Sequence, residues 1–163
     1  MQKAKNSVFK DYVQIRGFFR VAIEQDGKII GDSGYMQNQV TNLGFDQYLC
    51  QLLGAMAGSK QIGYVALGTG SAPNASHTTL NGEIMGSTQR KAVTATTTGS
   101  KTLRFTATFA SSDSFVTGAT NISNVGLFNT TSTNATLFAG NTFASSSLNT
   151  NQNCNLTYDL QFS

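Results

Sequence analysis

The stretch CNLTYDLQF (residues 154–162) decides the fold, because apolar and polar residues alternate along all nine positions. Its apolar members are Cys154, Leu156, Tyr158, Leu160 and Phe162. A period of two places these side chains on one face of an extended strand and the polar ones on the other. The stretch therefore predicts a strand that is half buried against a core.

The same alternation recurs near the N-terminus, where Phe19, Val21 and Ile23 share one face. Asp26-Gly27 follows, and this dipeptide is a strong hairpin-turn signal. Further short strands are expected at residues 28–31, 35–40, 62–67, 90–97, 102–109, 121–128 and 137–143. Short strands separated by turns favour a mainly β fold, an antiparallel β-sandwich of jelly-roll-like form.

One segment has the spacing of a helix instead. Its apolar residues fall at i, i+3, i+4, i+7, i+8 and i+11: Phe45, Tyr48, Leu49, Leu52, Leu53 and Met56. This spacing predicts an amphipathic helix near residues 43–57, with Thr41 or Asn42 as its cap and Gly58 as its stop. A helix of this length is marginal alone, so its apolar stripe is expected to lie on a sheet.

Length and composition indicate one folded domain with a weakly charged surface. The 163 residues fit a single domain, and eleven Phe and five Tyr can fill its core. Only 12% of the residues are charged, about half the usual share of roughly 25%. Ser, Thr and Asn replace the missing charges, which suits hydrogen-bonded contacts with other protein copies. We expect residues 17–163 to form one β-sandwich domain.

The N-terminal segment is basic. Its cations are Lys3, Lys5, Lys10, Arg16 and Arg20. We interpret residues 1–16 as an extended arm that docks on an acidic protein surface, with these cations as the partner-binding residues. No nucleic-acid-binding motif accompanies them, so direct binding of nucleic acid is disfavoured.

Residues suited to catalysis or metal binding are scarce. The single histidine, His77, lies in a polar loop, and the eight acidic residues are scattered. Gly68-Thr69-Gly70 lacks the third glycine of a dinucleotide motif and the lysine of a P-loop. Cys50 and Cys154 fit no metal spacing and are expected to be buried thiols. We therefore expect a protein that is not an enzyme and has no catalytic residue, cofactor or metal site.

Several short motifs follow one another in a characteristic order. They are VTNLG (40–44), YVALGTG (64–70), AP (72–73), TLNGE (79–83), Arg90, NVGLFN (124–129) and LFA (137–139). From about residue 36 onward this order resembles a widespread family of small bacteriophage virion proteins. Similar segments occur in the N-terminal parts of tail-fibre and tail-collar proteins.

The resemblance also implies roles for individual residues. The family usually has an acidic residue where this chain has Asn124. Glu83 is then the remaining acidic partner for Arg90, in place of a salt bridge to position 124. Leu80, Leu127 and Phe128 are expected in the core.

The resemblance implies a structural role in a phage particle. The sequence ends on the alternating strand, which favours a stand-alone module over a fibre. We expect a capsid decoration or cement protein, assembled in the host cytoplasm, that contacts the major capsid protein. Homo-oligomers, often trimers, are expected of such proteins. The alternative is a small tail, neck or baseplate component that contacts tail proteins.

Two further classes are disfavoured by the sequence. A receptor- or carbohydrate-binding module is disfavoured by the absence of Trp. A membrane protein is disfavoured because no run of eighteen apolar residues occurs, and no hydrophobic stretch of a signal peptide follows the basic start.

Overall fold

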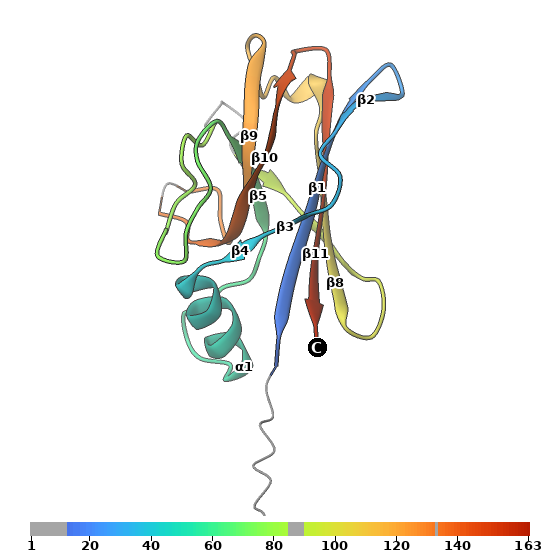
Figure 1. The fold of residues 1–163 in the computed structure, drawn as a ribbon. Helices are drawn as coiled ribbons and strands as arrows, with labels where there is room; N and C mark the ends of the chain where they lie inside the picture. Colours follow the sequence, from blue (N-terminus) through green and yellow to red (C-terminus); the bar gives the residue numbers. More distant parts are fainter. Residues whose placement is uncertain (1–12, 85–89, 133) are drawn as a thin grey trace, which may run out of the picture.

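The protein is a sandwich of two antiparallel sheets, seen in a computed structural model that describes residues 13–84, 90–132 and 134–163 (Figure 1). The first sheet contains β1 (Ile15–Gln25), β2 (Lys28–Asp32), β3 (Met36–Gln37), β7 (Thr94–Thr97), β8 (Thr102–Phe109) and β11 (Asn153–Phe162). The second contains β4 (Gln39–Val40), β5 (Tyr64–Gly68), β6 (Lys91–Ala92), β9 (Thr120–Phe128) and β10 (Leu137–Leu148). The predicted mainly β, antiparallel sandwich is confirmed.

The strand that the alternating stretch predicts, β11, occupies the middle of the first sheet. The strand order is β2-β1-β11-β8-β7, so β11 pairs with β1 on one side and β8 on the other. Its alternate residues Cys154, Leu156, Tyr158 and Leu160 are buried, whereas Phe162 at its end is half-buried. The second sheet has the order β4-β10-β9-β5-β6.

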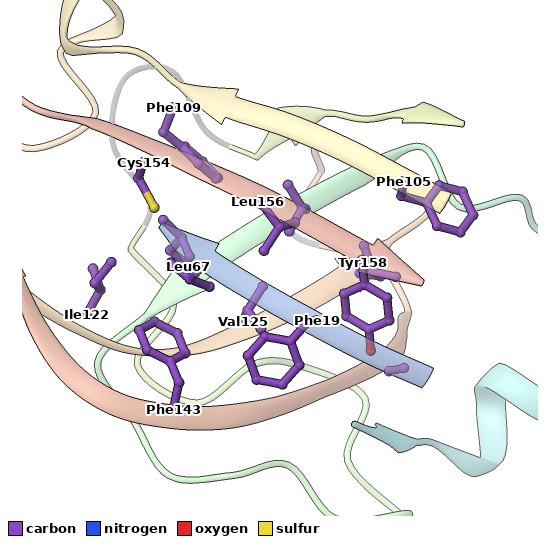
Figure 2. Packing of buried hydrophobic residues seen from close by; sticks show 14 of the residues in the cluster. Phe19, Leu67, Phe105, Phe109, Ile122, Val125, Phe143, Cys154, Leu156 and Tyr158 are labelled. Carbon is purple, nitrogen blue, oxygen red and sulfur yellow. The ribbon is translucent and has the colours of Figure 1, made fainter. Parts of the chain in front are cut away.

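The main core fills the space between the two inner faces (Figure 2). Phe19 of β1 stacks on Tyr158 of β11, with ring centroids 6.1 Å apart, and meets Phe143 of β10 edge-on at 6.2 Å. Full burial of a large apolar side chain is worth about 1.5–3 kcal/mol. The two alternating strands near the ends of the sequence thus supply one wall of the core.

Two segments cross from one sheet to the other, which differs from the single strands predicted at 35–40 and 90–97. In Figure 1 the first segment runs from β3 in the first sheet to β4 in the second. Between these strands the Asn38 amide donates to the Gly17 carbonyl at 2.9 Å. The second segment runs from β6 to β7, and between them the Val93 amide donates to the Gly63 carbonyl at 3.0 Å.

A smaller core lies on the outer face of the second sheet, under the loop at residues 69–83. Its members are Ala66, Leu80, Phe128, Ala135 and Leu137. The loop approaches the sheet so closely that a Cβ on Gly68 of β5 would lie 2.9 Å from the Gly82 carbonyl oxygen. The predicted core residues Leu80, Leu127 and Phe128 are all buried.

The helical segment is shorter than the predicted 43–57. It consists of the π-helix η1 (Gly44–Cys50) and the single turn α1 (Gln51–Leu53). The predicted cap is confirmed, because Thr41 Oγ1 accepts a hydrogen bond from Gly44 N–H at 3.0 Å. The helix ends early because Gly54 leaves helical geometry and Ala55 takes a positive φ of 48°.

Candidate interaction surfaces

The predicted basic arm is only partly within the described residues. Lys3, Lys5 and Lys10 lie outside them. Arg16 and Arg20 belong to β1, and even Gln14 exchanges two backbone hydrogen bonds with Ser163, at 2.8 and 3.0 Å. The first sheet therefore begins inside residues 1–16.

Arg20 is engaged within the fold. Its Nε lies 2.9 Å from Asp32 Oδ1 and its Nη2 lies 2.5 Å from Asp32 Oδ2. Hydrogen bonds from Arg20 and from the Gly34 amide lower the pKa of Asp32 to about 2. The exposed Arg16 side chain donates to Gln14 Oε1 at 3.0 Å.

The prediction that the apolar stripe of the helical segment lies on a sheet is confirmed only in part, for Tyr48 and the half-buried Leu49. Only Tyr48 is buried, where it packs edge-on against Phe138 at 5.2 Å and donates to the Thr136 carbonyl. The i, i+3 and i+4 spacing places apolar side chains on one face of an α-helix. A π-helix has i to i+5 hydrogen bonds and more residues per turn, so the same spacing spreads these side chains over a wider arc. Leu53 is consequently 90% exposed.

Beside this helix the sandwich opens into an apolar pocket of about 280 Å³. Its apolar lining comes from the helical segment, from the segment before β5 and from both sheets. The residues are Tyr48, Leu49, Leu52, Ile62, Leu103, Phe105, Phe138, Leu160 and Phe162. Phe45 and Leu53 are exposed on the same helical segment, and Met56 is exposed shortly after it. We call the pocket lining and these three residues together the apolar end. In Figure 1 the helix, the start of β1 and the C-terminus all lie at this end.

Lys60 is the lysine in the lining of this pocket. It donates to Gln47 Oε1 at 2.5 Å and to Thr136 Oγ1. These bonds join the segment after the helix to the second sheet, so the pocket wall is held in place. The apolar end is a preformed surface with few polar groups.

Arg90 and Glu83 form a buried ion pair, with side-chain exposures of only 3% and 9%. Nε lies 2.6 Å from Oε1 and Nη2 lies 2.8 Å from Oε2, and Nη1 donates to the carbonyls of Thr130 and Ser132. The guanidinium also lies 3.7 Å above the Phe128 ring. Glu83 is thus the partner of Arg90, as the departure at Asn124 predicts. The pair fastens two loops to the second sheet.

Asn124 of β9 binds the loop at residues 69–83 near both of its ends. Its Nδ2 donates to the Asn81 carbonyl at 2.8 Å and to the Ser71 carbonyl at 3.3 Å. A carboxylate could not donate either bond. Asn124 therefore holds both ends of the loop at residues 69–83 against the second sheet.

The remaining candidate residues do not converge. Cys50 is exposed, contrary to the expected burial, because it faces away at the end of the π-helix. Cys154 is buried, and burial raises the pKa of its thiol to about 12. His77 stays in its loop, where its Nδ1 accepts from the Asn74 amide at 3.3 Å. Among the described residues no three His, Cys, Asp or Glu side chains gather as a metal site would require.

The fold and these surfaces define an antiparallel β-sandwich with an uncovered apolar end. Comparisons with protein-family models, with curated proteins and with solved structures gave no match. In the part of the chain that the structure describes, no helix has the length and apolarity that a membrane crossing requires.

Proposed function

We propose that this chain is a structural protein of a bacteriophage particle, a capsid decoration protein that works by binding other virion proteins. The apolar end is the observation that carries the proposal. It combines an open apolar pocket of about 280 Å³ with Phe45, Leu53 and Met56, which are between 45% and 90% exposed. Contiguous exposed apolar surface of this kind is typical of protein–protein interaction sites.

The position of the apolar end supports the same function. The described part of β1 starts at this end of the sandwich (Figure 1), and the preceding residues carry Lys3, Lys5 and Lys10. Apolar contacts would supply affinity, while the basic segment would orient the protein on an acidic shell. Many copies on one particle would add avidity to each weak contact.

The test uses Leu53→Glu, which places a charge on the exposed helical part of the apolar end. Leu53 is 90% exposed, so the variant is expected to fold normally. Ile30→Glu is the matched control, because Ile30 is 57% exposed in the β1–β2 hairpin at the opposite end of the sandwich (Figure 1). Each labelled variant is added to phage particles that lack the protein, and bound copies are counted after sedimentation and located by electron microscopy.

We expect the unchanged protein and Ile30→Glu to coat the capsid, and Leu53→Glu to bind at least about tenfold more weakly, a loss of about 1.4 kcal/mol. Equal binding by Leu53→Glu would remove the apolar end from the interface. Label on the tail, or none on the particle, would reject the decoration function.

A further inference from the structure

The outer face of the first sheet carries a second, chemically different site. Side chains from three neighbouring strands form one row there, since Phe18 of β1 pairs with Asp159 of β11, which pairs with Arg104 of β8. Together with Gln161 and Tyr35 these residues line a shallow depression of about 380 Å³. A volume of about 300–1,000 Å³ is usual for small-molecule sites.

The polar floor of the depression is fixed by an ion pair. Arg104 binds Asp159 in a bidentate pair, with Nε–Oδ1 and Nη2–Oδ2 distances of 2.7 Å. The Asp159 side chain is only 8% exposed, although it lies on the outer face. The two charges cancel each other inside the depression, which therefore favours a neutral ligand over an ion.

The aromatic wall is also held in place. Tyr35 follows a turn that is fastened to β1 by the Arg20–Asp32 pair and by Ser33 Oγ, which accepts from the Val21 amide at 2.9 Å. Tyr35 lines the same depression as the Arg104–Asp159 pair, yet remains 53% exposed.

Several polar groups around the depression have spare hydrogen-bonding capacity. Among the described residues, no hydrogen bond engages Arg104 Nη1, the Tyr35 hydroxyl or the Gln161 amide. Each Asp159 oxygen accepts one bond from Arg104 and can accept another. A ligand with several hydroxyl groups could bond to all of these at once.

The absence of Trp disfavours carbohydrate binding on the sequence alone, but Phe18 and Tyr35 supply aromatic surface in this depression. We propose that the depression binds a neutral sugar residue of a glycan. A pyranose ring has an apolar C–H face, which would pack on Phe18 or Tyr35, and a rim of hydroxyls, which would bond to Arg104, Asp159 and Gln161. Rigid aromatic side chains supply such contact area at low entropic cost. The site does not depend on the proposed role in a capsid, and it uses a different face from the apolar end.

The experiment measures binding of the full chain to an array of neutral oligosaccharides of glucose, galactose, mannose and N-acetylhexosamines, with sialylated and sulfated ones beside them. Hits are titrated by saturation-transfer NMR. Tyr35→Ala removes the exposed wall, and Arg104→Met removes the free donor. Phe45→Ala is the control, because it removes an aromatic side chain of similar exposure, 45%, from the apolar end. Thermal unfolding confirms that each variant is folded.

We expect at least one neutral glycan to bind with a Kd of about 1 mM or below, which corresponds to about 4 kcal/mol. Tyr35→Ala and Arg104→Met should each weaken binding at least about tenfold, whereas Phe45→Ala should bind as the unchanged protein does. Absence of binding to every neutral glycan, binding to acidic glycans alone, or full binding by folded Tyr35→Ala would each overturn the assignment.

Discussion

At the scale of single residues, Arg90 should contribute strongly to stability through its buried ion pair. Arg90→Met leaves Glu83 as an unpaired carboxylate that is only 9% exposed, together with two unbonded carbonyls. Breaking a buried pair in this way costs about 3–5 kcal/mol. We expect urea unfolding to show a loss of that size. Arg20→Met is the control, and the exposed pair that it breaks should change the free energy of unfolding far less.

Asp32 should make stability depend on pH at the acidic end. Its pKa is about 2 in the folded protein, against about 3.9 in an unfolded chain. The folded state therefore holds this proton less readily, so the stabilisation is complete above about pH 5 and is lost as the pH falls through the folded pKa of about 2. Carboxyl titration by NMR should give the low pKa, and Arg20→Gln should raise it. An unchanged pKa in Arg20→Gln would show that Arg20 is not its cause.

The two cysteines should react differently with a thiol reagent. Cys50 is exposed, whereas Cys154 is fully buried with a pKa of about 12. Because the thiolate is the reactive form, the native protein at pH 8 should be labelled at Cys50 alone, and the denatured protein at both. Mass spectrometry of the labelled peptides distinguishes them. Rapid native labelling of Cys154 would contradict its burial.

At the scale of secondary-structure elements, the helical segment gives an unusual prediction. Replacing a helical Gly by Ala normally stabilises a helix by about 1 kcal/mol. A Cβ on Gly44, however, would lie 2.3 Å from the Phe138 carbonyl oxygen in β10. Gly44→Ala should therefore destabilise the protein in urea unfolding. The matched control Gly54→Ala, whose Cβ would come no closer than 3.3 Å to a flexible Met56 side chain, should be close to neutral.

How far the sequence predicts each element depends on how local its cause is. Alternation is a local property, so β1, β8, β9 and β11 fall close to their predicted residues. The segments at residues 35–40 and 90–97 are each divided between the two sheets, at Asn38 and at Val93. Which sheet each half joins depends on its distant partner strands, so no local sequence pattern predicts the division. The sequence pattern likewise does not distinguish the π-helix from an α-helix, because its apolar residues also satisfy α-helical spacing.

The candidate surfaces were predictable only in part. Glu83 was predicted as the partner of Arg90 from the motif order and the absence of an acid at Asn124. The apolar end joins residues from the helix, β8, β10 and β11, and the outer depression depends on the register that aligns Phe18, Asp159 and Arg104. Register is a property of paired strands, which a single stretch of sequence does not specify.

At the scale of the whole molecule, the basic N-terminal segment should act in binding rather than in folding. Since Gln14 already pairs with Ser163, the informative truncation removes residues 2–12 and keeps β1 whole. This variant should match the unchanged protein in thermal unfolding but fail to bind particles. The matched control replaces Lys3, Lys5 and Lys10 by Gln, and should reproduce much of the loss if charge is the cause. Normal coating by the truncated protein would exclude a role for the segment.

The pairing of β1 with β11 also sets when the protein can fold during its synthesis. These strands come from near the two ends of the sequence, yet they lie side by side at the centre of the first sheet. Ribosomes add about 5–20 residues per second, so β1 can pair with β2 and β3 at once, whereas the edge that pairs with β11 stays open for several seconds. Such long-range pairing is also slow to form. The nascent chain is therefore exposed to aggregation until β11 is made, and chaperone binding to β1 during translation should raise the yield of folded protein.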